Sequence, residues 1–213
     1  MKFAYPFVIA LAKGYYKLFY RYKVYGKEHF YEGGAVIAAN HTSFLDPPLL
    51  AISWPQEVHF LATDYLFKVP LLGKLITILN SHPVHRGAAD LNSIRKICDL
   101  LKNGAKVIVF PEGRRSKEGS FAHLKPGIGL IVLKSEAAII PAYIHGTFEA
   151  WPSGKRFPKL FGKTIVVFGS PILPSNFHIE DKKGFQQAIV DKLEHSIRAL
   201  KKWYDDGAKG IPP

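Results

Sequence analysis

The sequence predicts a single α/β domain with a largely parallel central sheet flanked by helices. Short apolar runs that end at glycine, proline or asparagine indicate buried strands, and segments with helical spacing alternate with these runs. Such alternation is typical of a parallel sheet. A chain of 213 residues with 47% apolar composition can bury a sizeable core, and it contains no internal repeat or Gly/Ser/Pro-rich linker. We therefore expect one domain.

The N-terminal residues predict an amphipathic helix in front of this domain. Tyrosines alternate there with lysine and arginine, so nearly every aromatic ring carries a polar tip. Such rings beside cations suit the headgroup layer of a membrane. We interpret residues 1–25 as a membrane-interfacial helix and residues 26–213 as the α/β domain; the alternative is a helix packed on the core. No run approaches the roughly 20 apolar residues that span a bilayer.

Within the domain, predicted strands and helices follow one another along the chain. The strand at residues 35–39 leads to a helix at residues 46–52, which Asp46 is predicted to cap. The further strands are expected at residues 58–62, 106–110, 138–144 and 164–168. The further helices are expected at residues 64–79 with interruptions at Pro70 and Gly73, from Asp90 onward, at residues 127–134 and at residues 181–204.

The charge balance indicates an anionic partner. Lysine and arginine total 29 against 17 aspartate and glutamate, a net charge of +12. Nucleic acid, acidic lipid headgroups and a phosphorylated substrate all suit this charge, but the sequence has no nucleic-acid recognition element. The single cysteine, Cys98, excludes an intramolecular disulfide and a multi-cysteine metal site, and the histidines lack zinc-ligand spacing. We expect no metal and no nucleic-acid partner.

The first candidate site follows the strand at residues 35–39, in the segment Asn40-His41-Thr42-Ser43-Phe44-Leu45-Asp46. Ligands of open α/β sheets usually bind at such strand ends. His41 suits proton transfer near neutral pH, and a carboxylate bonded to its other ring nitrogen fixes the tautomer. Because Asp46 is too far along the chain to share a helix face with His41, a turn has to fold the carboxylate back. The alternative is a structural histidine beside a helix cap.

Basic residues form further candidate anion sites. In the segment 110–116, Gly113 permits a tight turn, and Arg114 and Arg115 beside it suit a phosphate. Arg86 lies in the basic segment 82–87, and Lys125 precedes a Pro-Gly pair. These residues either converge on one phosphate or lie in solvated loops where Glu112 neutralises an arginine. The residues alone leave both interpretations open.

Several catalytic motifs are absent from the sequence. It has no Gly-x-Ser-x-Gly elbow, no P-loop and no Gly-x-Gly-x-x-Gly. A histidine–aspartate dyad without a protein nucleophile indicates that a hydroxyl of the substrate is the nucleophile. That description fits acyl transfer to an alcohol.

Four sequence blocks together resemble the glycerolipid acyltransferases. Asn40, His41 and Asp46 match the first block, and residues 110–116 match the third, with Arg114 where threonine is usual. Residues 80–86 are similar to the second block, with Asn80 in place of glycine, and residues 139–142 are similar to the fourth, a strand with a central proline. The blocks occur in the family's order and cover residues 25–172, most of the chain.

The resemblance implies a role for each matched residue. His41 is the general base and Asp46 its orienting partner. Glu112, Gly113 and Arg115 belong to the acceptor site, and Arg86 helps to hold the acceptor's phosphate. We assign Lys125 to the substrate-binding residues as well, because it is a further basic element near a predicted strand end.

The resemblance also implies a reaction and a location. We expect transfer of a fatty acyl group from an acyl-carrier protein or coenzyme A thioester to the 2-hydroxyl of lysophosphatidic acid, giving phosphatidic acid without a cofactor. The alternatives are glycerol 3-phosphate or another lysophospholipid as acceptor, or a non-catalytic basic protein that binds membranes. We expect a peripheral or monotopic protein on the anionic, cytoplasmic face of the cell membrane.

Overall fold

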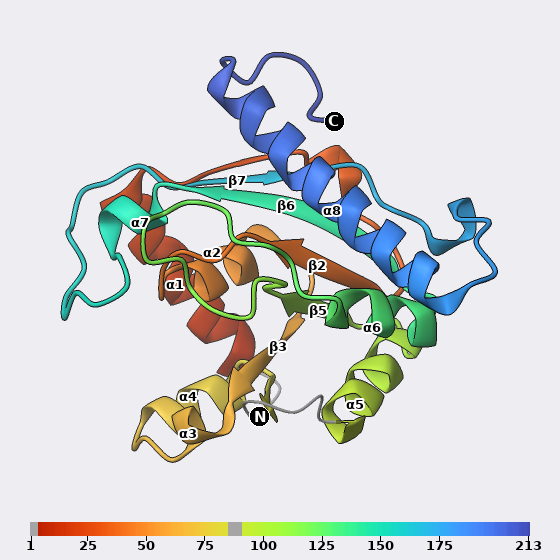
Figure 1. The fold of residues 1–213 in the computed structure, drawn as a ribbon. Helices are drawn as coiled ribbons and strands as arrows, with labels where there is room; N and C mark the ends of the chain where they lie inside the picture. Colours follow the sequence, from red (N-terminus) through yellow and green to blue (C-terminus); the bar gives the residue numbers. More distant parts are fainter. Residues whose placement is uncertain (1–3, 85–90) are drawn as a thin grey trace.

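The computed structural model describes residues 4–84 and 91–213, and in this part of the chain it contains one seven-stranded sheet with helices on both faces (Figure 1). The strand order is β1-β7-β6-β2-β5-β3-β4. In that order the strands span Lys23–Tyr25, Ile165–Phe168, Ala138–His145, Ala35–Ala39, Lys106–Val109, Val58–Thr63 and Ser81–Val84. β6 and β7 pair antiparallel, while the other five strand pairs are parallel. The predicted α/β class and largely parallel sheet are confirmed.

The sheet is buried on both faces by helices. Ala35, Ile37 and Ala39 of the central strand β2 join one apolar cluster with α1 and α2, while Val36 and Ala38 join a second cluster with α5, α6 and α8. Continuous apolar runs are expected where both faces of a strand are covered. The helices are α1 (Ala4–Tyr20), α2 (Asp46–Ser53), α3 (Asp64–Phe67), α4 (Leu72–Ile78), α5 (Leu91–Lys102), α6 (Gly127–Ser135), α7 (Thr147–Ala150) and α8 (Lys182–Asp205).

The tyrosines of α1 pack in the core, which corrects the reason for interpreting residues 1–25 as interfacial. Tyr16 and Tyr20 are buried, and their hydroxyls donate to the carbonyls of Leu45 and Lys159 at 2.7 and 3.0 Å. The polar tips of these rings are therefore satisfied by the protein. The large apolar side chains of α1 that are exposed are Phe7, Leu11 and Leu18. Among the described residues, no helix is both long enough and apolar enough to cross a membrane.

The structure also changes several predicted element boundaries. The predicted helix at residues 1–25 ends at Tyr20, Arg21 adopts a left-handed backbone with φ of 41°, and β1 follows as an edge strand. β4 and α7 were not predicted, because β4 contains a serine, a histidine and a proline instead of an apolar run, and α7 is a single helical turn. Gly73 does not interrupt its helix. It lies inside α4, where a Cβ atom would stand 2.3 Å from the carbonyl oxygen of Phe67.

We expect Tyr16→Phe to lower the free energy of unfolding by about 1 kcal/mol, because the substitution leaves the carbonyl of Leu45 without its buried hydroxyl donor. Urea denaturation measures this change. Phe7→Ala, on the exposed side of the same helix, is the control and should alter stability by less than about 0.5 kcal/mol. Equal stability of Tyr16→Phe and the wild type would contradict the anchoring role of this hydroxyl.

Candidate active site

The turn between β2 and α2 is fixed at its start by Asn40. The side-chain amide of Asn40 donates to the carbonyl of Ile144 at 3.0 Å and accepts from the Ile144 N–H at 2.8 Å. This pair of bonds continues the contact of β2 with β6 one residue beyond the strand. The chain then turns at His41, so that the ring of His41 faces the side chain of Asp46 at the start of α2.

Asp46 gathers three donors on one carboxylate oxygen. Its Oδ2 accepts from His41 Nδ1 at 2.8 Å and from the backbone N–H groups of Thr42 and Ser43 at 2.7 and 2.8 Å. Asp46 is fully buried and is the first helical residue of α2. The expectation that it caps this helix is therefore wrong: its carboxylate caps the preceding turn. That turn brings His41 and Asp46 together, as the motif predicted.

Three further contacts hold His41 in place. The ring lies nearly parallel to Phe110, with centroids 4.0 Å apart, the backbone N–H donates to Glu112 Oε1, and the carbonyl accepts from the Ser116 N–H. Because an ionised carboxylate can only accept, Nδ1 carries the proton toward Asp46, and Nε2 keeps its lone pair. No residue within 4–84 or 91–213 forms a hydrogen bond with Nε2, so this nitrogen can accept a proton from a substrate.

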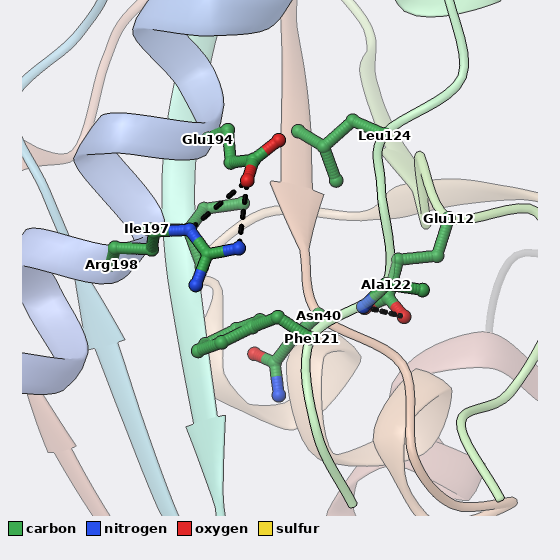
Figure 2. Close-up of a pocket in the computed structure, with 8 residues that line it drawn as sticks. All are labelled: Asn40, Glu112, Phe121, Ala122, Leu124, Glu194, Ile197 and Arg198. Atoms are coloured by element: carbon green, nitrogen blue, oxygen red, sulfur yellow. Dashed lines mark hydrogen bonds and ion pairs between the residues drawn. The ribbon is translucent and has the colours of Figure 1, made fainter.

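Glu112 is a buried structural carboxylate and not an exposed substrate ligand. It is 3% exposed, and its two oxygens accept from the backbone N–H groups of His41 and Ala122. Burial raises the pKa of Glu112, while these two bonds act in the opposite direction. Figure 2 shows its carboxylate turned toward Ala122, at the edge of a cavity of about 10 Å³ beside α8. A cavity of this size holds at most one water molecule.

Gly113 and Lys125 come together at the turn after β5. Gly113 has a φ of 70°, and a Cβ atom on it would stand 2.7 Å from Lys125 Nζ. The Lys125 N–H donates to the carbonyl of Pro111 at 2.8 Å, so the backbone also joins the two ends of the connection between β5 and α6. Arg114 beside them is exposed. The structure therefore places Lys125 directly over the turn at Gly113.

Arg115 packs on an aromatic wall next to the His41 turn. Its guanidinium carbon lies 3.5 Å from the centroid of the Phe44 ring, and Phe44 in turn contacts Trp151, with centroids 5.3 Å apart. The Ser43 hydroxyl donates to the carbonyl of Trp151 at 2.7 Å, which ties this wall to the turn. A flat guanidinium held against a ring presents its edge in a fixed direction, as bidentate phosphate binding requires.

A family model described as Acyltransferase matches residues 21–145 of this chain, more than half of its length. The chain belongs to the acyltransferase family. The match runs from the start of the sheet to the last residue of β6 and includes His41, Asp46 and the loop that follows β5.

The matches to individual acyltransferases cover different shares of those proteins. A 1-acyl-sn-glycerol-3-phosphate acyltransferase of Bacillus subtilis is 31% identical over 86% of this chain and 89% of its own. A chloroplastic enzyme of the same name from Arabidopsis thaliana is 30% identical over 72% of this chain, which spans only 44% of that relative. A crystal structure of the 1-acyl-sn-glycerophosphate acyltransferase of Thermotoga maritima matches with a TM-score of 0.69 and 27% identity, over 89% of this chain and 80% of that one.

The structure describes only part of the basic segment at residues 82–87. Arg86 lies outside the described residues. His82 is in β4, and its Nε2 shares a hydrogen bond of 3.0 Å with Nδ1 of His59 in β3. The ring centroids are 5.2 Å apart and the planes differ by 14°, so the rings lie edge to edge in one plane. Burial lowers the pKa of His82 to about 4, which leaves it uncharged at neutral pH.

Other residues that shape the site were not predicted from the sequence. Phe110 contacts the ring of His41, Phe44 and Trp151 contact each other beside Arg115, and the Thr147 hydroxyl lies 3.3 Å from that of Thr42. Phe44 and Phe110 belong to the recognised motifs, so their spacing was a usable signal. Trp151 and Thr147 follow β6, more than 100 positions after the turn they contact. No local pattern indicates such a contact.

We expect stability to fall as the pH drops from about 6.5 to about 4, because the pKa of His82 is held below its ordinary value by burial, with Lys96 and His59 adding to the shift. In this window the unfolded chain binds more protons than the folded one. Burial and Lys96 lower the pKa of His59 too, and Glu57 opposes them. The free energy of unfolding, measured by urea denaturation at several pH values in this range, should depend less steeply on pH in His82→Gln than in the wild type. An equal pH dependence in His82→Gln and the wild type would contradict the assignment of this effect to His82. So would an equally reduced pH dependence in the exposed control His178→Gln.

Proposed function

We propose that this chain transfers a fatty acyl group from an acyl thioester, carried by acyl-carrier protein or coenzyme A, to the 2-hydroxyl of lysophosphatidic acid. The observation that carries the proposal is the buried Asp46 carboxylate bound to Nδ1 of His41, which leaves Nε2 to act as a base at the edge of the sheet. The names of the Bacillus and Thermotoga relatives support this acceptor. The product is phosphatidic acid.

The proposed reaction begins with proton transfer to His41. Nε2 takes the proton of the 2-hydroxyl as the hydroxyl oxygen attacks the thioester carbonyl carbon. The tetrahedral oxyanion then collapses, the carbon–sulfur bond breaks, and the imidazolium returns the proton to the thiolate. Asp46 stabilises the transient positive charge on the imidazole. The balance of this reaction requires no metal and no redox cofactor.

We infer that Arg115 and Lys125 bind the phosphate of the acceptor. Arg115 lies against Phe44, two positions before Asp46, and Lys125 lies over the turn at Gly113. Arg86 is the third proposed phosphate ligand by resemblance. Glu112 serves the same site indirectly, since it holds the backbones of His41 and Ala122 in place. Two cations at one loop cluster suit a dianionic phosphate.

We also infer that the protein acts as a peripheral protein on the cytoplasmic face of an anionic membrane, where a soluble thioester meets a lipid acceptor. The outward side of α1 supports this location. Phe7, Leu11 and Leu18 are 60–70% exposed there, next to the exposed Lys13 and Lys17. Cations beside exposed apolar side chains suit the headgroup layer.

His41→Ala should lower kcat for thioester-dependent acylation by about 10²- to 10⁴-fold, the usual contribution of a general base. Thiol release with lysophosphatidic acid, glycerol 3-phosphate or another lysophospholipid measures both activity and acceptor choice. The exposed His123 lies on the loop that precedes Lys125, so His123→Ala is the matched control and should keep full activity. A folded His41→Ala enzyme with most of its activity would contradict the proposal. Absence of thioester-dependent product in the wild type would favour a non-catalytic membrane-binding protein.

Arg115→Ala should raise the KM for the acceptor more than the KM for the thioester, because a phosphate contact acts equally in the ground and transition states. Phe44→Leu should increase the KM for the acceptor by a factor between about three and ten, because it removes the aromatic face under the guanidinium. Phe44→Tyr keeps that face and serves as the control, with near wild-type kinetics. If the thioester KM rose instead, Arg115 would bind the phosphates of the donor carrier.

A further inference from the structure

The connection from Lys155 to Lys163, here called the docking loop, combines exposed apolar side chains with cations. Its sequence is Lys-Arg-Phe-Pro-Lys-Leu-Phe-Gly-Lys, which contains four cationic residues and no acidic one. All four cations are exposed, and none forms an ion pair with a residue that the structure describes. The proposed function assigns no role to any of these side chains.

The apolar side chains of the docking loop lie in solvent. Phe157 is 72% exposed, Leu160 48% and Phe161 78%. Phe161 also has a φ of 65°, a left-handed backbone that costs a bulky residue conformational energy. The loop therefore exposes an aromatic ring to water, which is unfavourable for an apolar group, and does so with a strained backbone at Phe161. Several apolar side chains exposed together, one of them at a conformational cost, are typical of a surface that binds another surface.

Hydrogen bonds and a ring contact attach the docking loop to the rest of the protein. The Gly162 N–H donates to the carbonyl of Phe19 at 2.9 Å, the Tyr20 hydroxyl donates to the carbonyl of Lys159, and the Phe161 ring contacts Phe19 at 5.5 Å. These contacts attach the loop to the end of α1, whose exposed Leu18 precedes Phe19. Two apolar exposed segments thus lie next to each other.

The docking loop also shares an edge of the sheet with His41. β2 and β6 run parallel, His41 follows β2, and α7 and the docking loop follow β6 (Figure 1, teal). A β-bridge between Ser43 and Pro152 and the bond from Ser43 to the carbonyl of Trp151 connect the His41 turn to the start of this connection. Whatever surface the loop binds is therefore held at a fixed distance from His41.

We propose that the docking loop inserts Phe157, Leu160 and Phe161 into the headgroup layer of an anionic bilayer, with Lys155, Arg156 and Lys159 at the lipid phosphates. Lys163 points elsewhere: its ammonium lies 5.6 Å from the centroid of the Tyr204 ring in α8. Phenylalanine and leucine carry no hydrogen-bonding groups, so an apolar layer satisfies them better than the polar edges of a nucleic acid. The guanidinium of Arg156 lies 5.2 Å from the Phe157 ring, which places a cation beside the inserted ring. The inference adds a binding surface to the proposed function and relies on that function for its purpose.

Vesicle flotation with the full chain tests the apolar contribution. The probe is vesicles of phosphatidylcholine with phosphatidylglycerol, against phosphatidylcholine alone. Replacing both rings, Phe157→Ser with Phe161→Ser, should reduce partition at least tenfold, because the variant no longer buries either aromatic ring in the lipid. The control is Ile211→Ser, which removes a side chain that is 70% exposed near the end of the chain. Equal partition of the double variant and the wild type would overturn the proposal.

A charge reversal tests the cations in the same assay. Lys155→Glu with Arg156→Glu should weaken binding to anionic vesicles by about fivefold or more per residue and have little effect on neutral vesicles. Lys182→Glu with Lys183→Glu changes the net charge by the same amount at the exposed start of α8 and should bind nearly as the wild type does. Equal weakening by the two pairs would mean that net charge alone attracts the protein, which would overturn the loop's specific role.

The depth of insertion separates this proposal from the proposed function. The chain already contains Trp54, Trp151 and Trp203, so quenching is measured as the increase over the wild type. Brominated lipids should quench Phe157→Trp more than the wild type, whereas Ile211→Trp should show no such increase. Activity on a short-chain, monomeric acceptor should be unchanged in the Phe157→Ser/Phe161→Ser variant. Full activity without quenching would overturn the docking loop alone. Quenching of Phe157→Trp, together with a wild-type protein that shows no acyltransferase activity, would support the docking loop and contradict the proposed reaction.

Discussion

The buried carboxylate of Asp46 is the interaction on which the site depends. An isolated charge at zero exposure carries a large desolvation penalty unless hydrogen bonds compensate for it. Here two backbone N–H groups of the preceding turn and His41 Nδ1 all point at one oxygen. The same bonds that offset the penalty also set the path of the turn and the orientation of the imidazole. Local folding and the chemistry of His41 therefore have one cause.

Around this carboxylate, buried polar side chains serve the backbone, and exposed side chains remain for ligands. Asn40 bonds to β6, Glu112 bonds to two loops, and the Tyr16 hydroxyl bonds to the residue before Asp46. Lys125 is exposed on the same loops, and the partly buried Arg115 packs on Phe44 beside the turn. A rigid inner layer beneath a charged outer layer is the arrangement expected of a pre-organised site.

Much of the fold follows from local sequence patterns. The strands at residues 35–39, 58–62 and 138–144 are close to their observed bounds, since apolar runs bounded by turn residues are strong signals. The burial and the hydrogen-bond partners of Tyr16 and Glu112 were not predictable from local patterns. A tyrosine suits both a membrane interface and a core with a carbonyl acceptor, and a glutamate beside arginines suits both an ion pair and backbone donors. Tertiary partners decide between such alternatives, as does the contact of Trp151 with Phe44.

The most direct test of the account is the tautomer of His41, read from the ¹⁵N chemical shifts of its ring by NMR in alkaline buffer. If the Asp46 carboxylate orients the imidazole, Nδ1 carries the proton and Nε2 is unprotonated in the wild type. Asp46→Asn, in which the carboxylate acceptor is lost, should shift the population toward the other tautomer. A wild-type ring protonated at Nε2 would contradict the account, because that nitrogen then has no lone pair to accept the proton of a substrate hydroxyl.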